Sequence, residues 1–235
     1  FTAADFVKRV HAITAQLISR NQGALIVGGT HFYLKALCLG LWEAPPTQPQ
    51  FRASIQTQTT ATLFAELSAK DPAYAQKIGP EDRYRITRAL EIILFSHSLP
   101  SELEAEARTR SPDPRFPLLW MDRNPEELEE RILKRTEQML EQGLVQETER
   151  LLEHFPSARA LESVGYRQVV DYLRGKKPEG RNPLPGIEGL KSEIILATRQ
   201  LVKGQRTFLR GFEFGERFLF EADRLRLREH IETLL

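Results

Sequence analysis

The sequence predicts an α/β fold interrupted by an all-helical subdomain, and three patterns lead to that prediction. Within residues 1–43 an amphipathic helix, a short apolar run, a glycine turn and a second helical pattern follow one another, as in an α/β unit. Residues 44–114 carry helical patterns and turns without a convincing strand pattern. Strand patterns return at 116–121 and 218–220. We therefore expect residues 1–43 and 115–235 to form the core, with 44–114 inserted as a helical subdomain.

The first helix is expected to begin after Thr2, because a threonine followed three residues later by an acidic residue is typical of a helix N-terminus. It should end near residues 21–23. The apolar run 24–27 predicts a buried strand, and a glycine turn at 28–30 separates this strand from a second helix through residues 33–39.

Helical spacing dominates the second half of the chain. Helices are expected at 125–154, 158–173, 187–210 and 222–235. Gly143 interrupts the first of them and predicts a bend or a helix boundary. The Gly- and Pro-rich segment 175–186 is expected to be a loop.

Composition limits the class of protein. Hydrophobic residues make up 41% of the chain and charged residues 28%, as in a soluble globular protein. The apolar runs are far shorter than the roughly 20 residues that span a bilayer, so no membrane partner is expected. The single cysteine, Cys38, cannot form an intrachain disulfide, which favours a reducing, cytoplasmic location. A net charge of +1 leaves the distribution of charge to indicate whether a polyanion binds.

A stripe of cations lies on the predicted helix 187–210. Arg199, Lys203, Arg206 and Arg210 recur every three or four residues, and residues 194–212 contain no acid. Cations on one helix face repel one another, so a bound RNA backbone is one reason for the stripe. The alternative is a solvated face whose cations pair with acids elsewhere in the fold, and the pattern alone does not choose between them.

Two smaller basic groups permit the same two interpretations. Arg85 and Arg88 lie one turn apart in a predicted helix, where pairing with nearby acids such as Glu91 is the favoured interpretation. Arg131 and Arg135 are also one turn apart, beside an acidic cluster. They are either helix-face ion pairs or a clamp for a diphosphate, which two guanidinium groups can neutralise.

Two glycine-containing segments are weaker signals. Gly28–Thr30 would place N–H groups and a hydroxyl at a helix N-terminus, where anions are favoured, but it is not a P-loop and no Walker sequence occurs in the chain. Ser163–Arg167 offers a glycine, an aromatic ring and a cation, which suit RNA. The five histidines have no metal-ligand spacing, so no protein metal site is expected.

Five stretches occur in an order typical of one enzyme family. They are Thr2–Phe6, Val27–Leu37, Arg88–Glu91, Val164–Gln168 and Ala197–Gln200. In these stretches, and over essentially its whole length, the chain resembles the bacterial tRNA dimethylallyltransferases. The resemblance implies a P-loop-kinase-like α/β core.

This resemblance also implies an activity and its partners. The family transfers a dimethylallyl group from dimethylallyl diphosphate to the exocyclic amine of the adenosine just 3′ of the anticodon, assisted by Mg²⁺. The expected partners are therefore the anticodon stem-loop of tRNA and the prenyl diphosphate, and the chain is expected to be a monomer. Cleavage of the carbon–oxygen bond leaves a diphosphate, which cations must receive, and the target base must be unstacked.

Carried over by motif, Arg135 is the expected catalytic residue and would hold the diphosphate together with Arg131. The residues expected to contact tRNA are Thr30, Tyr84, Arg85, Arg88, Ser163, Gly165, Tyr166, Arg167, Arg199, Lys203, Gln205, Arg206 and Arg210.

The sequence departs from the family in two respects. Family members carry, near their start, a P-loop strand and an aspartate regarded as the general base, and these 235 residues contain neither, so we expect no activity unless that segment is supplied. Gly204 stands where the family has arginine, which costs helix propensity and one phosphate contact. The alternatives are a non-catalytic RNA-binding remnant and a small-molecule kinase of the same core fold.

Overall fold

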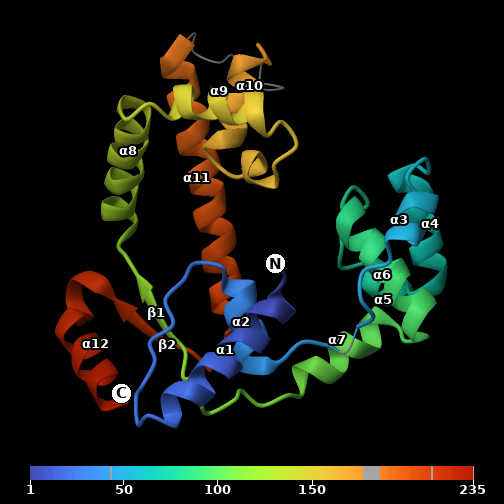
Figure 1. Ribbon diagram of the computed structural model, residues 1–235, viewed down its shortest axis with the longest axis horizontal. Coiled ribbons are helices and arrows are strands. Elements are labelled where there is room, and N and C mark those ends of the chain that lie inside the picture. The colour runs from blue at the N-terminus through green and yellow to red at the C-terminus, as the bar shows by residue number, and fades with distance from the viewer. Residues whose placement is uncertain (43, 177–185, 213, 235) are drawn as a thin grey trace. The chain divides into compact units, whose positions relative to one another are not determined.

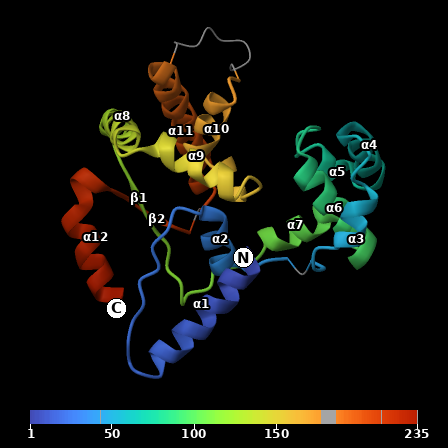
Figure 2. The same cartoon turned by 45° about the horizontal axis from the view of Figure 1, so that its top comes forward.

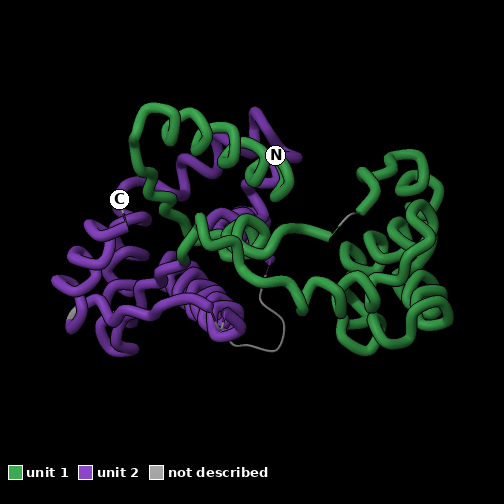
Figure 3. The backbone as a smooth tube through the Cα atoms, turned by 90° about the horizontal axis from the view of Figure 1, so that it is seen from below, with its two compact units in different colours: residues 1–117 green, residues 118–235 purple. Residues whose placement is uncertain are grey.

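The computed structural model describes residues 1–42, 44–176, 186–212 and 214–234, which form two compact units. The first unit comprises residues 1–117 and the second residues 118–235 (Figure 3). Each unit is described by itself below. The expected grouping of residues 1–43 with 115–235 around an inserted 44–114 stays a prediction.

The first unit opens with two helices that pack on each other. Helix α1 spans Ala3–Ile18 and α2 spans His31–Leu39. The expected cap at Thr2 is confirmed, because the Asp5 N–H donates to the Thr2 hydroxyl at 3.2 Å while the Thr2 N–H donates to the Asp5 carboxylate at 2.8 Å. The rings of Phe6 and Tyr33 lie 5.3 Å apart and join the two helices.

The predicted strand at 24–27 is wrong. These residues form no strand, and the side chains of Leu25 and Val27 are 59% and 85% exposed. A strand needs a neighbouring strand for its backbone hydrogen bonds, and the described part of residues 1–117 contains none. Apolar β-prone composition therefore did not suffice to make a strand here.

The rest of the first unit is helical, as predicted. Its helices are α3 (Pro49–Ser54), α4 (Thr60–Lys70), α5 (Pro72–Ala75), α6 (Arg83–Ser96) and α7 (Pro100–Arg108) (Figure 1). Leu63, Leu67 and Ile86 are fully buried at the centre of their core. Buried Asp71 joins two helix starts, since its carboxylate accepts from the N–H of Tyr74 in α5 at 3.0 Å and of Ser101 in α7 at 2.9 Å.

A parallel pair of strands begins the second unit. Strand β1 (Leu119–Asp122) pairs with β2 (Glu216–Leu219), with Leu119 opposite Glu216. Both strands were predicted, although their bounds differ by a few residues. Parallel strands require a long crossover, which here consists of helices, so the α/β fold class is confirmed.

The crossover and the C-terminal segment supply the remaining helices. They are α8 (Pro125–Glu141), α9 (Leu144–His154), the 3₁₀ turn η1 (Arg159–Glu162), α10 (Tyr166–Leu173), α11 (Gly186–Arg210) and α12 (Phe220–Leu234). Helix α8 runs beside α11, and α9 and α10 pack against these helices at one end (Figures 1 and 2). Val169 and Ile194 are fully buried between them.

Two glycines divide helices that the sequence predicted as longer. Gly143 has φ +91° and separates α8 from α9, as expected. Gly165 has φ +99° and separates η1 from α10, so the predicted helix at 158–173 is interrupted. Of the predicted loop 175–186, residues 177–185 lie outside the described residues.

Candidate nucleic-acid interface

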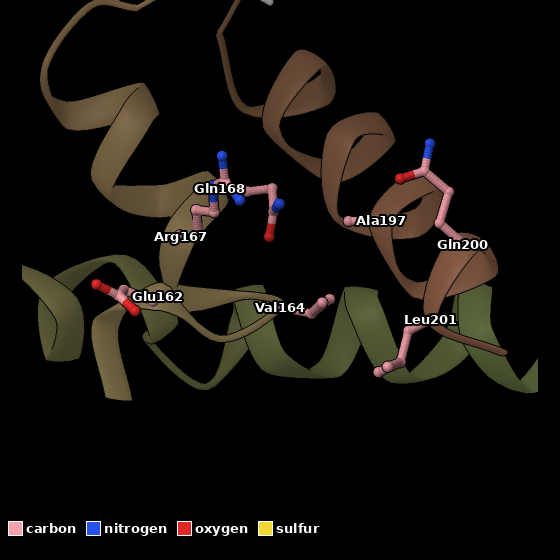
Figure 4. A pocket seen from close by; sticks show the side chains of 7 residues that line it. All are labelled: Glu162, Val164, Arg167, Gln168, Ala197, Gln200 and Leu201. Carbon is pink, nitrogen blue, oxygen red and sulfur yellow. The ribbon is translucent and has the colours of Figure 1, made fainter. Parts of the chain in front are cut away.

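A pocket of about 270 Å³ lies between α11 and the segment that leads into α10. Glu162, Val164, Arg167 and Gln168 form one wall, and Ala197, Gln200 and Leu201 of α11 form the other (Figure 4). The two walls come from the fourth and fifth stretches that carry the family resemblance. Sequence positions about 30 residues apart are therefore brought together by the packing of α10 on α11.

The local backbone sets this geometry. Gly165 adopts a φ that L side chains rarely adopt, and its N–H donates to the Gln168 side-chain oxygen at 2.8 Å. This hydrogen bond caps α10 and occupies the amide oxygen, which leaves the Gln168 amide nitrogen as a donor. Gly165 thus fixes both the start of α10 and the orientation of the Gln168 side chain in the pocket wall.

The lining combines polar and apolar groups. Two amides, a guanidinium and a carboxylate lie beside the aliphatic side chains of Val164 and Leu201. Such a lining suits a planar ligand that needs hydrogen bonds at its edge and apolar contact on its face, as an unstacked base does. Among the tRNA-contact predictions only Arg167 lines this pocket. Glu162 and Val164 lie in the segment 162–167 that the resemblance aligns with RNA contacts. Gln168, Ala197 and Gln200 were signalled by lying in the resembling stretches, and Leu201 lies just beyond them.

The four stripe cations all lie on α11, but two of them are paired with acids. Arg199 donates to the Glu129 carboxylate of α8 at 2.9 Å, and Arg206 donates to the Asp122 carboxylate of β1 at 2.7 Å. Lys203 and Arg210 are exposed and form no ion pair within the described ranges. The sequence left pairing and RNA binding open, and pairing holds for half of the stripe.

Asp122 is the centre of a charged cluster at the carboxyl end of β1. It accepts hydrogen bonds from Arg206 and from Arg217 of β2, both at 2.7 Å, and its side chain is only 11% exposed. Burial alone would raise the pKa of this carboxyl. The hydrogen bonds from Arg206, the Arg123 N–H and Arg217 outweigh burial and hold the pKa below its ordinary value, so Asp122 is a carboxylate.

In the first unit, Arg88 is held by a buried acid. The Glu91 carboxylate is fully buried and accepts from Arg52 at 2.7 and 2.9 Å, from Arg88 at 3.0 Å and from the Gln48 N–H at 3.1 Å. Arg88 also donates to the Pro45 carbonyl at 2.6 Å. The favoured interpretation, ion pairing with Glu91, is therefore confirmed for Arg88.

Tyr84 and Arg85 remain available on the surface of α6. Tyr84 is 63% exposed, and the Arg52 guanidinium lies 5.9 Å from its ring centre. Arg85 is exposed and lies 3.4 Å from Asp82, a surface ion pair of small energetic value.

The other predicted residues have mixed surroundings. Arg131 and Arg135 are exposed on α8 one turn apart, and Arg131 lies 3.9 Å from Glu127. Thr30 precedes α2 and is exposed, and its hydroxyl makes no capping hydrogen bond. Ser163 donates to the Ala160 carbonyl at 2.6 Å, and Tyr166 donates to the Glu147 carboxylate. Gln205 is half-buried.

Neither a metal cluster nor a membrane span is found in the part of the chain that the structure describes. Among the described side chains, no group of three or more His, Cys, Asp or Glu is arranged to hold a metal ion. Among the described helices, none is both long and apolar enough to cross a bilayer.

The molecule is thus an α/β protein whose helical crossover carries a mixed polar pocket and exposed cations. Its sequence matches the model of the IPP transferase family over residues 1–212, and the chain belongs to that family. It is 38% identical over 213 residues to a tRNA dimethylallyltransferase of Sorangium cellulosum (strain So ce56), covering 88% of this chain and 65% of that protein. A tRNA dimethylallyltransferase of Francisella tularensis subsp. novicida (strain U112) is 35% identical, with coverages of 91% and 69%.

Solved structures share the fold. A tRNA isopentenylpyrophosphate transferase from Bacillus halodurans superposes with a TM-score of 0.62 at 22% identity, covering all of this chain and 74% of that one. A eukaryotic dimethylallyltransferase acting on tRNA gives a TM-score of 0.68 at 23% identity, with coverages of 89% and 52%. The chain spans 57 to 69% of the length of the first three curated relatives that it matches.

Proposed function

We propose that this chain acts in the transfer of a dimethylallyl group to an adenosine beside the anticodon of tRNA. The observation that supports this most is the pocket where the stretches Val164–Gln168 and Ala197–Gln200 meet. A concave site lined by apolar side chains and a few polar groups is the default candidate for ligand binding. We infer that this pocket takes an unstacked base of the anticodon loop.

Cations would supply the remaining affinity. Exposed cations on α11 would hold the RNA backbone, and Tyr84 and Arg85 would offer a second contact surface on the first unit. Arg131 and Arg135 would hold the diphosphate, because two guanidinium groups one turn apart can neutralise the charge that develops on the leaving group. We extend this proposal to a monomer that works in the cytoplasm.

Mg²⁺ is included in the proposed function only because the family resemblance implies it. Mg²⁺ prefers oxygen ligands and is commonly held by one or two carboxylates together with substrate phosphates. The described residues offer no cluster of three potential ligands, so any Mg²⁺ would have to be held largely by the substrate phosphates. We therefore derive no step of the reaction through the ion.

The test fills the pocket without changing charge. Ala197→Leu should weaken binding of an anticodon stem-loop RNA about tenfold or more, because one base loses its place, while the salt dependence stays the same. Ser192→Leu is the control, since it places the same leucine side chain at an exposed position of α11 outside the pocket.

Equal binding by wild type and Ala197→Leu would contradict the assignment of the pocket. If the stem-loop is bound but the protein, supplied with a P-loop segment, transfers no prenyl group, a non-catalytic RNA-binding protein becomes the better interpretation.

A further inference from the structure

The four cations of the α11 stripe lie in two different environments. Arg199 and Arg206 each reach a carboxylate on another element, whereas Lys203 and Arg210 are exposed without an ion pair among the described residues. Four cations on one helix face therefore need not have the same role, because they differ in what their side chains contact.

Arg206 is the most firmly held of the four. Its guanidinium donates to the Asp122 carboxylate from Nε at 3.1 Å and from Nη2 at 2.7 Å, and Nη2 also donates to the Arg123 carbonyl at 2.6 Å. The side chains of Arg206 and Asp122 are 25% and 11% exposed. These bonds use the Nε and Nη2 donors, so this edge of the guanidinium is not available to clamp a phosphate.

Arg199, also on α11, makes a similar contact with an acid on helix α8. It donates to both oxygens of Glu129 on α8, at 2.9 and 3.1 Å for Nε. Helix α11 is thus tied to β1 through Arg206 and to α8 through Arg199. The exposed Arg199–Glu129 pair is the weaker tie, so the partly buried contacts of Arg206 contribute more to how far α11 is rotated about its own axis.

Lys203 and Arg210 lie farther than Arg206 from the buried face of α11. Three residues of an α-helix advance by 300°, so Lys203 lies about 60° around α11 from Arg206. Arg206 borders the buried face, which includes fully or largely buried Ile195 and Leu209, whereas Lys203 and Arg210 are exposed. Neutralisation of Arg199 and Arg206 by acids also lowers the repulsion that a stripe of four cations would otherwise suffer.

We propose that the stripe is divided between two positioning residues, Arg199 and Arg206, and two phosphate-binding residues, Lys203 and Arg210. Asp122 and Glu129 are positioning residues in the same sense, since they act on the RNA only by fixing α11. This division rests on the proposed function for the identity of the ligand, which is an RNA backbone. It assigns Arg199 and Arg206 a different role from the one that the family resemblance implied.

The experiment measures, for five variants, the salt dependence of binding to an anticodon stem-loop RNA and the thermal unfolding midpoint. Lys203→Gln and Arg210→Gln should each lower the slope of log K against log salt by about 0.7 to 0.9, the value for one phosphate, and leave the unfolding midpoint unchanged. Arg206→Gln should leave the slope unchanged and lower the midpoint. The Arg206→Gln/Asp122→Asn double variant should lower the midpoint by less than the sum of the two single variants, because the two residues share one contact, although Arg206 also bonds to the Arg123 carbonyl.

Each arm can overturn the division. A slope reduction for Arg206→Gln as large as that for Lys203→Gln would show that Arg206 is a phosphate ligand. An Arg206→Gln midpoint equal to that of Arg210→Gln would show that Arg206 does not anchor α11. Absence of binding to any RNA would remove the role given to Lys203 and Arg210. A stem-loop with a scrambled loop separates the two proposals: equal binding contradicts the tRNA function, while the slopes still report which cations meet phosphates.

Discussion

At the scale of the residue, the Glu91 carboxylate shows how a charge is kept inside the first unit. It is fully buried, and every contact that it accepts comes from a group that is itself fixed: Arg52 on α3, Arg88 on α6 and the Gln48 N–H before α3. Burial alone would raise the pKa of Glu91, but the hydrogen bonds from Arg52, Arg88 and Gln48 lower it below its usual value. The acid thus joins helices that are far apart in the sequence.

Replacing Glu91 should therefore be costly. Glu91→Gln removes the charge and leaves two arginines without their partner, so we expect the free energy of unfolding of the first unit to fall by about 3 kcal/mol, the lower end for a broken buried pair, because both arginines are partly exposed. Denaturant unfolding measures this loss. Glu66→Gln, at an exposed pair with Lys70, is the matched control and should change stability by less than about 0.5 kcal/mol.

The same residue predicts a pH dependence. Because the folded pKa of Glu91 lies below the ordinary value of 4.5, its stabilisation is fully present above that pH and is lost as the pH falls through the folded pKa. The difference in stability between wild type and Glu91→Gln should shrink as the pH is lowered from about 7 toward about 3. A difference that grows in acid would contradict the direction of the pKa shift.

At the scale of the element, two glycines of the second unit have opposite effects on their helices. Gly204 lies inside α11 with no atom within 4 Å of the position that a Cβ would take. Gly165 has equally open surroundings, but its φ of +99° is one that side-chain-bearing residues rarely adopt. The backbone angle, and not the space around the Cβ position, therefore decides whether a side chain is tolerated at each glycine.

These two positions give a paired prediction. Gly204→Ala should stabilise the second unit by about 0.5 to 1 kcal/mol, because alanine loses less conformational entropy in a helix. Gly165→Ala should destabilise it by about 1 to 3 kcal/mol through backbone strain, and should also displace Gln168 from the pocket. Thermal unfolding of both variants against wild type measures the pair, and changes of the same sign would refute the structural distinction.

At the scale of the whole molecule, the chain consists of two units, each with a hydrophobic cluster of its own. Its two tryptophans are divided between them: Trp42 contacts Tyr74 in the first unit, and Trp120 lies in β1 of the second. Each unit therefore carries one natural fluorescent reporter.

This division predicts local effects of mutations. In a Trp120→Phe background, where Trp42 reports, Glu91→Gln should lower the denaturant midpoint. In a Trp42→Phe background, where Trp120 reports, the same substitution should leave the midpoint almost unchanged, because stability is not shared uniformly across the chain. Equal shifts in both backgrounds would mean that residues 1–117 and 118–235 unfold as one cooperative body.

Much of the local structure could be predicted from the sequence because it depends on neighbours in the chain. The cap at Thr2, the break at Gly143 and the helix that carries the basic stripe follow from short-range hydrogen bonds and 3.6-residue periodicity. Two predictions failed because composition and spacing do not report strand partners or backbone angles. Residues 24–27 have the composition of a strand but no paired neighbour, and a helix pattern at 158–173 did not reveal the positive φ at Gly165.

The sequence by itself determined the family, the helical nature of residues 44–114 and the row of cations at 199, 203, 206 and 210. Only the tertiary structure decided which of those cations are neutralised, that Arg88 serves a buried acid, and that residues 164–168 and 197–201 enclose one pocket. The physical reason is that periodicity places a side chain on a face of its own element. The partner across that face, which sets its charge, burial and chemistry, comes from a distant part of the chain.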